Sequence, residues 1–151
     1  MTVRDMSDTI TPSLLNYLEA ISAILKNKQV ARIRDIAAIC EVKIPSVCSA
    51  MVRLTKLGYI NYETGEFITM NRSGFSLVKK YGQRRDIIEG FLRDIVHMDS
   101  EMARDEARML VFSFTEAAYE RIVNCLAVNR KPAHPDDKIG ASSEVAELNQ
   151  R

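Results

Sequence analysis

The segment SVCSAMVRLTKLGYINYETGEFITM, residues 46–70, decides the fold because it joins a helix pattern directly to a hairpin pattern. In its first half, apolar residues recur at helical spacing: Val47, Ala50, Met51, Leu54 and Leu57. Gly58 follows as a helix-ending residue. Two short runs, 59–62 and 67–70, then flank a Gly-containing turn at 63–66, which is typical of a β-hairpin. A recognition-type helix followed at once by a hairpin predicts a winged helix.

Two more helices are expected upstream. Thr11-Pro12-Ser13 is a typical helix start, and the following residues 14–25 carry an apolar stripe on one side. The segment ARIRDIAAICEV, residues 31–42, predicts a short helix, and Lys43-Ile44-Pro45-Ser46 forms a turn into the next one. A helix, a brief turn and a second helix with a polar outer face make a helix-turn-helix.

Charge is distributed unevenly along the chain. The net charge is +1, but residues 26–72 carry eight basic and four acidic side chains, so this segment is +4 and the remainder is −3. A basic segment that coincides with a helix-turn-helix favours binding to double-stranded DNA, although basic helix faces are also often merely solvated. The residues expected to contact DNA are Arg32, Arg34, Lys43, Pro45, Ser46, Ser49, Arg53 and Lys56.

The remainder of the chain predicts helices beyond the wing. A long helix follows residue 74, Asp99-Ser100 begins another, and Ser113 or Thr115 begins a last one. The fold class is therefore mainly α: a winged helix-turn-helix domain at 1–74 and an all-α dimerisation domain at 75–128. A flexible tail is expected at 129–151, where apolar periodicity ends. Two copies would place two recognition helices on one duplex.

Composition excludes several classes of protein. Hydrophobic residues make up 46% of the 151 residues, and no apolar run reaches the roughly 18 residues that cross a bilayer. No export signal is present at the N-terminus, so we expect a cytoplasmic protein without membrane contact. The three cysteines form no CxxC pair and are expected to be buried free thiols. Because no phosphate loop, nucleophile elbow or HExxH occurs, we do not expect an enzyme.

The order of these elements resembles one family, the metal-dependent repressors of the diphtheria-toxin-repressor and manganese-transport-regulator type. The similar segments cover roughly residues 11 to 126: TPSLLNYLEAI, ARIRDIAAICEV, PSV, LGYINYE, FITMNRSG and RRDIIEGFL. The resemblance implies a winged helix, a helical dimerisation domain, and repression by a metal-loaded homodimer. It also implies a manganese or iron(II) site between the first helix, the long helix after the wing, and the next helix.

The ligand positions that the resemblance implies are only partly kept. Asn16 replaces Asp or Met, Glu19 matches the manganese branch, Arg85 replaces a histidine, and Glu106 matches an acidic or cysteine ligand. Met109 and Leu110 replace a glutamate and a histidine. A guanidinium has no lone pair to donate to a metal, leucine donates nothing, and a thioether suits softer ions. We therefore expect no intact metal site and no cofactor.

Two interpretations of Arg85 stay open at this point. It stands where it would bridge Glu19 and Glu106, with its charge in place of the ion. Alternatively, it forms an exposed pair with Glu89 one turn along the same helix. Two other functions also stay open: a metal-dependent repressor with a rearranged site that uses Asn16, Glu19, Glu89, Glu106 or Met109, with manganese or iron(II), and a winged-helix interaction module that does not bind DNA.

Overall fold

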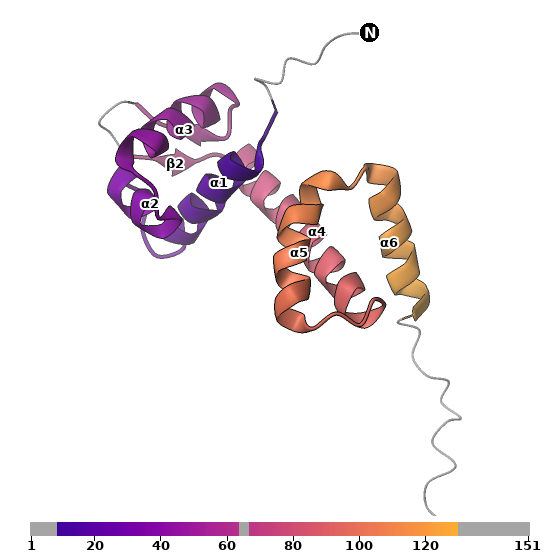
Figure 1. Ribbon diagram of the computed structural model, residues 1–151. Coiled ribbons are helices and arrows are strands. Elements are labelled where there is room, and N and C mark those ends of the chain that lie inside the picture. Colours follow the sequence, from indigo (N-terminus) through magenta and orange to yellow (C-terminus); the bar gives the residue numbers. More distant parts are fainter. Residues whose placement is uncertain (1–8, 64–66, 130–151) are drawn as a thin grey trace, which may run out of the picture.

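The computed structural model describes residues 9–63 and 67–129, which form two lobes joined by one long helix (Figure 1). The elements are, in order, α1 (Pro12–Leu25), α2 (Ile33–Cys40), α3 (Ile44–Lys56), β1 (Ile60–Asn61), β2 (Thr69–Met70), α4 (Arg72–Asp94), α5 (Ser100–Ser113) and α6 (Glu116–Asn129). This arrangement confirms the mainly α fold with a small hairpin. None of the helices described is both long and apolar enough to cross a membrane.

The winged-helix lobe consists of α1, α2, α3 and the hairpin. Thr11 caps α1 by accepting a hydrogen bond from the Leu14 N–H at 3.3 Å, and Pro12 occupies the first turn, where no backbone donor is required. The stripe that the spacing predicts is buried, and Leu18 and Ile21 are fully enclosed. They pack with Ile36, Val47, Met51 and Leu54 from α2 and α3 in one hydrophobic core.

The hairpin closes this core from the side of α3. Ile60 pairs with Met70 and Asn61 with Thr69 in antiparallel register, and a bridge from Ala31 to Ile68 ties the hairpin to the start of α2. The strands are shorter than the predicted runs 59–62 and 67–70, and the predicted turn residues 64–66 lie outside the described part. Gly58 has φ +78°, a left-handed conformation that glycine adopts without strain, so the chain turns sharply between α3 and β1.

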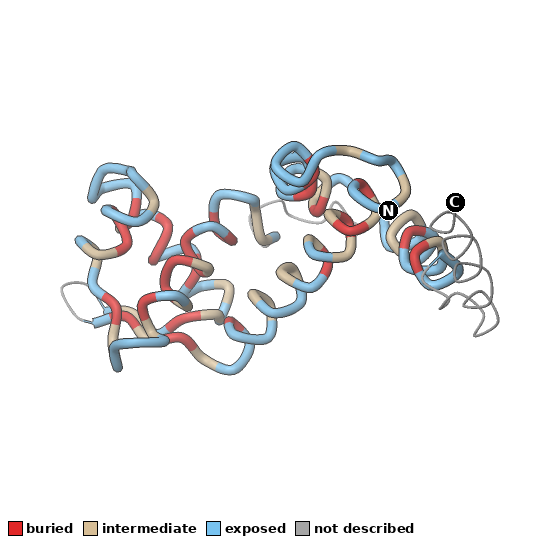
Figure 2. Tube along the Cα trace, turned by 90° about the horizontal axis from the view of Figure 1, so that it is seen from below, coloured by how far each residue is buried: buried red, intermediate tan, exposed pale blue. Residues whose placement is uncertain are grey.

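Helix α4 belongs to both lobes. Its cap is Asn71, which accepts a hydrogen bond from the Gly74 N–H at 3.0 Å, so the helix already begins at residue 72. Leu77 and Val78 pack on the first core, whereas Ile88 and Leu92 enter a second one. The predicted division between residues 74 and 75 therefore falls inside a continuous helix. Figure 2 shows this long helix running without a break between the two lobes.

The helical lobe consists of the second half of α4 with α5 and α6. Its core contains Ile88 and Leu92 of α4 and Ala103, Ala107 and Val111 of α5. Asp99 caps α5 as predicted, by accepting hydrogen bonds from the N–H groups of Glu101 and Met102. Of the two predicted caps for α6, Thr115 is the one used. The predicted tail from residue 130 onward lies outside the described residues.

Gly74 and Gly82 both lie on α4, but only Gly74 packs closely against the hairpin, so alanine substitutions at the two positions test this packing. A Cβ added at Gly74 would overlap the Tyr59 carbonyl oxygen and lie 2.6 Å from Cγ of Met70, whereas one added at Gly82 meets nothing within 4 Å. We expect Gly74→Ala to lower the free energy of unfolding by about 1–3 kcal/mol, because the hairpin must move away. Gly82→Ala is expected to raise it by about 0.5–1 kcal/mol, because alanine favours the helix. Urea denaturation measures both, and equal effects would contradict the close seating of α4.

Candidate nucleic-acid interface and cavity between the lobes

The outer face of α3 carries the side chains expected to contact DNA. Val47, Ala50, Met51 and Leu54 are buried on the inner face. Ser46, Ser49, Arg53 and Lys56 recur at three- or four-residue spacing on the opposite side and are all exposed. Thr55 is also exposed, but its hydroxyl donates back to the Met51 carbonyl at 2.8 Å, which occupies that donor within the helix. This arrangement is able to present hydroxyls near the start of a helix and cations near its end to a phosphate backbone.

The other four predicted residues surround this face. Arg34 is exposed on α2, Lys43 at the N-cap position of α3, and Pro45 in the first turn of α3. Glu41 takes a left-handed conformation with φ +54° and so ends α2 and turns the chain toward α3. Arg32 occupies the N-cap position of α2 without a side-chain capping hydrogen bond. Its guanidinium carbon lies 5.2 Å from the centre of the Phe67 ring of the wing. Arg32 therefore connects the helix-turn-helix to the wing.

The sequence pattern did not single out the apolar side chains on the same face. Ile39, Ile44 and Val52 are about half exposed, at 53%, 47% and 47%. They fall outside the buried stripes of α2 and α3, and that departure from the periodicity is the signal that would have found them. In a major groove, apolar side chains of this kind contact thymine methyl groups.

A cavity of about 310 Å³ lies between the two lobes, where α1, α4 and α5 meet. Its lining residues are Pro12, Leu15, Asn16, Glu19, Arg85, Arg108, Val111 and Phe112. Within it, Nη1 of Arg85 donates a hydrogen bond to Oε1 of Glu19 at 2.8 Å. Each of these two side chains is 27% exposed, so the ion pair is partly shielded from solvent. It joins α4 to α1 across a separation of 66 residues.

The neighbouring Arg84 points to a different partner. Its side chain is 11% exposed, and Nη1 donates to Oε2 of Glu116 at 2.9 Å. Its guanidinium carbon lies 4.4 Å from the centre of the Tyr119 ring, which fastens α4 to α6. Adjacent residues on a helix differ by about 100° in direction, so the arginine pair serves two interfaces. Arg84 stabilises the helical lobe, and Arg85 connects the lobes.

The residues expected on α5 are not those that reach the cavity. Glu106 is exposed beside Asp99, Glu101 and Asp105, Met109 is 71% exposed, and Leu110 packs against the second core. The cavity is instead lined by Arg108, Val111 and Phe112, which have the same spacing two residues further along. A shift of two residues rotates a helical position by about 200°, so it moves a side chain to nearly the opposite face. The α5 residues that line the cavity are thus Arg108, Val111 and Phe112, and not Glu106, Met109 and Leu110.

The contacts decide between the two interpretations of Arg85. Arg85 pairs with Glu19 and not with Glu106, so only half of the expected bridge is formed. Among the described residues, Arg85 and Glu89 form no ion pair either, and the carboxylate of Glu89 instead lies 4.0 Å from Nε of Arg104. Arg85 consequently makes a contact between lobes and not one within its own helix.

The donors around the cavity do not suit manganese or iron(II). Both arginines are unable to coordinate a metal, and Leu15, Val111 and Phe112 offer no lone pair. The remaining donors are the Asn16 amide and the Glu19 carboxylate, which already neutralises Arg85. Hard divalent ions require more oxygen or imidazole ligands than this pair supplies. Across the described residues, no three side chains of His, Cys, Asp or Glu come together in a group able to hold a metal ion.

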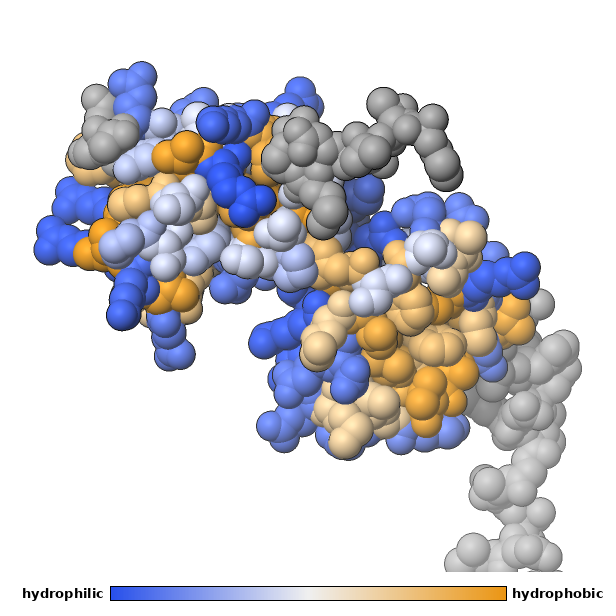
Figure 3. Space-filling view, turned by 45° about the horizontal axis from the view of Figure 1, so that its top comes forward, coloured by the Kyte–Doolittle hydropathy of each residue, from blue (hydrophilic) through white to orange (hydrophobic). Residues whose placement is uncertain are grey.

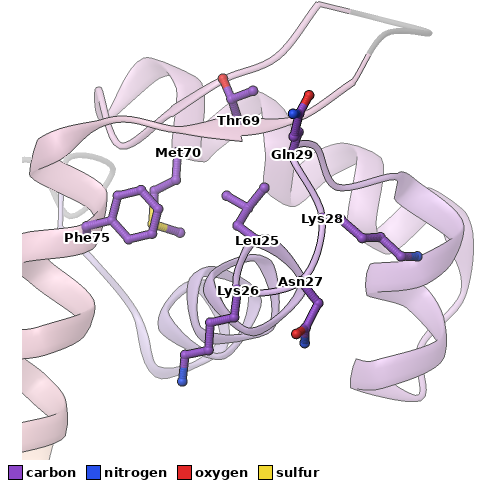
Figure 4. A pocket seen from close by; sticks show the side chains of 8 residues that line it. All are labelled: Leu25, Lys26, Asn27, Lys28, Gln29, Thr69, Met70 and Phe75. Atoms are coloured by element: carbon purple, nitrogen blue, oxygen red, sulfur yellow. The ribbon is translucent and has the colours of Figure 1, made fainter.

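Cys40 and a second pocket provide no comparable site. Burial raises the pKa of the Cys40 thiol, which keeps it protonated and a poor nucleophile at neutral pH. A pocket at the end of α1 is lined by three apolar side chains, Leu25, Met70 and Phe75, and by five polar ones, Lys26, Asn27, Lys28, Gln29 and Thr69 (Figure 4). Lys28 is already paired with Asp35 at 3.0 Å.

The helix-turn-helix, its wing and the exposed outer face of α3 define a winged-helix DNA-binding protein. Comparison with known proteins narrows this class. Residues 9–66 match the family model described as iron dependent repressor, N-terminal DNA binding domain. The HTH-type transcriptional regulator MntR of Lysinibacillus sphaericus (strain C3-41) is 30% identical over 132 residues, which cover 87% of this chain and 94% of that protein. The chain belongs to the DtxR/MntR family of metal-dependent transcriptional regulators, and it is not an enzyme.

Other relatives agree on the family and the fold. MntR of Bacillus subtilis (strain 168) is 29% identical over 112 residues, which cover 74% of this chain and 78% of that protein. The crystal structure of IdeR from T. acidophilum superimposes with a TM-score of 0.61 at 21% identity and covers 91% of this chain. This chain spans 65% of that IdeR chain.

The coupling across the lobes is measurable by a double-mutant cycle of Glu19→Gln and Arg85→Gln. We expect a coupling free energy of about 1 kcal/mol in urea denaturation, near the upper end for ion pairs, because both side chains are partly buried. The same cycle with Lys28→Gln and Asp35→Asn is the control, and its more exposed pair is expected to give less than about 0.5 kcal/mol. A coupling near zero for Glu19 and Arg85 would mean that the ion pair does not hold the lobes together.

Proposed function

We propose that the protein is a homodimeric, DNA-binding transcriptional regulator in which an internal ion pair, and not manganese or iron(II), holds the winged-helix lobe against the helical lobe. The observation that carries this proposal is the Arg85–Glu19 contact at 2.8 Å inside the cavity between the lobes. Arg108 lies in the same cavity. The arginine supplies a permanent positive charge beside Glu19, in the region where the family resemblance implies a metal cation. Such a regulator acts in the cytoplasm, where bacterial and archaeal DNA is found.

Double-stranded DNA is the partner that the winged-helix lobe fits best. Its eight predicted contact residues are all exposed, and its basic segment supplies the charge that duplex binding requires. Family members carry a DNA-binding domain in this region of the chain. The alternative of an interaction module without DNA binding has no specific observation in its favour.

The surface of the helical lobe supports association of two copies. Val96, Met102, Met109 and Val128 are each at least half exposed there. Figure 3 shows hydrophobic surface gathered over one face of this lobe. Extended apolar surface of this kind marks protein interfaces more often than free solvent-facing surface. A symmetric pair through this lobe would leave the outer face of both α3 helices free for adjacent turns of a duplex.

The regulatory proposal predicts DNA binding that does not respond to metal. We expect duplexes selected from a randomised library to bind with the same affinity in EDTA and in manganese, because the cation that joins the lobes is part of the chain. We also expect affinity to fall steeply with salt. Fluorescence anisotropy at two salt concentrations measures both. Loss of binding in EDTA would favour a metal-dependent repressor with a rearranged site, and absence of binding in every buffer would favour the interaction module.

Two variants are controls for this experiment. Arg53→Gln on the outer face of α3 is expected to weaken binding to all duplexes and to reduce the logarithmic salt slope by about one, as for one lost phosphate contact. Arg85→Gln leaves the DNA-contacting face unchanged. Its binding is expected to weaken without a change in the salt slope, because only the relative position of the lobes is affected.

Substitution of Met109, an exposed apolar residue on α5, tests whether the protein is a dimer. Met109→Glu places a charge on the exposed surface of the helical lobe, so we expect it to convert the dimer to a folded monomer in sedimentation equilibrium. Val52→Glu is the control, because Val52 is similarly apolar and exposed but lies on α3 in the other lobe. It is expected to stay dimeric and to lose DNA affinity. A wild-type monomer at micromolar concentration would contradict the dimer.

A further inference from the structure

The cavity between the lobes has the wrong sign of charge for a cation. Its ionisable lining residues are Glu19, Arg85 and Arg108, which sum to a formal charge of +1 from one acid and two bases. Glu19 and Arg85 neutralise each other at 2.8 Å, so the excess positive charge resides on Arg108. A divalent cation would raise the total to +3, whereas a monovalent anion would bring it to zero. Electrostatics therefore favour an anion in this space.

The donors required to bind an anion are available. Among the residues that the structure describes, no carboxylate lies within ion-pair distance of Arg108. Arg85 makes its hydrogen bond to Glu19 through Nη1, and a guanidinium carries five N–H donors in total. The exposed amide of Asn16 adds a further donor on the α1 side. Guanidinium groups match the planar geometry of a carboxylate and bind it by paired hydrogen bonds.

The other wall of the cavity is apolar and fixed in place. Leu15 and Val111 are 3% exposed, and Pro12 and Phe112 complete this side. The Phe112 ring stacks on Tyr81 with 5.1 Å between ring centres, which restricts its orientation. A volume of about 310 Å³ lies at the lower end of the range for small-molecule sites. The space suits a molecule with a charged end and a compact apolar body.

We propose that this cavity is a binding site for a small amphipathic carboxylate, with Arg108 and Asn16 holding the carboxylate and Val111 and Phe112 contacting the apolar body. The occupant would touch α1, α4 and α5 together, so it would stabilise the contact between the lobes in addition to the Arg85–Glu19 pair. The site would make the regulator responsive to an organic acid. Binding of the ligand itself does not depend on the proposed DNA interaction.

Binding of three probes to the full chain tests the site: benzoate, phenylacetate and hexanoate, with benzamide as the uncharged analogue of benzoate. By isothermal titration calorimetry we expect saturable binding of at least one carboxylate, at least about 10-fold tighter than its binding to Arg108→Gln. We expect benzamide to bind at least about 10-fold more weakly than benzoate if benzoate is the preferred probe. Arg104→Gln removes a guanidinium one turn away on α5, outside the cavity lining, and is expected to bind as the wild type does.

The result that would overturn the site is equally specific. Absence of saturable binding by all three carboxylates would exclude it, and so would binding that Arg108→Gln and Arg104→Gln weaken equally. Inorganic phosphate has no apolar body. If it bound more tightly than every carboxylate, contact with Val111 and Phe112 would not contribute to binding, and the proposal of an amphipathic carboxylate would be wrong. Because these measurements contain no DNA, their failure would leave the DNA-binding proposal unaffected, and failure of DNA binding would leave the ligand site intact.

Discussion

The ion pair between Arg85 and Glu19 is the constraint on which the relation of the two lobes depends. Glu19 lies on α1, whose apolar side is buried in the first core, and Arg85 lies on α4 three residues before Ile88, which is buried in the second. Helix α4 also packs on the first core through Leu77 and Val78, so the contact between the polar sides of α1 and α4 adds a second constraint on how the lobes are placed. Arg84, by contrast, acts within the helical lobe, where it joins α4 to α6 through Glu116 and Tyr119. Because both arginines extend from the same helix, α4 contacts α1 of the winged-helix lobe and α6 of the helical lobe at adjacent positions.

A covalently attached cation differs from a bound ion in one physical respect. A dissociable metal stabilises the state that binds it in proportion to its concentration, so it couples that state to the supply of the ion. A guanidinium stays protonated at all physiological pH values and is always present at the same position. If it fills the structural role of an ion, the lobes are held together whatever the metal supply. Any regulation of the proposed DNA binding must then enter by another route, and the proposed carboxylate site in the cavity that contains the pair would be one.

The winged-helix lobe was predictable from sequence because its signals are local. Caps, apolar periodicity and a turn at fixed offsets specify α1, α2, α3 and the hairpin, and the outer face of α3 follows from the positions of its buried residues. Ile44 and Val52 are apolar yet exposed, and the sequence indicates this only through their positions outside the buried stripe of α3. The partner of Arg85 was likewise predicted only in half, because its choice depends on the packing of α4 and α5.

Helix α5 shows why the candidate site was harder to predict than the fold. One face, with Ala103 and Ala107, is buried in the second core, and another, with Arg108 and Phe112, lines the cavity. A third face, with Met102 and Met109, is exposed. Val111 lies where the first two faces meet, so it is both a core residue and a cavity residue. Because α5 has three distinct environments, assigning the cavity to positions two residues too early selects side chains on the outer surface. The charge inferred for the cavity then has the wrong sign. With Glu106 in the cavity, the lining would hold two acids and one base, a charge that attracts a cation. With Arg108 in the cavity, the lining holds one acid and two bases, a charge that attracts an anion. The rotation of α5 about its axis therefore decides the sign of the charge in the cavity.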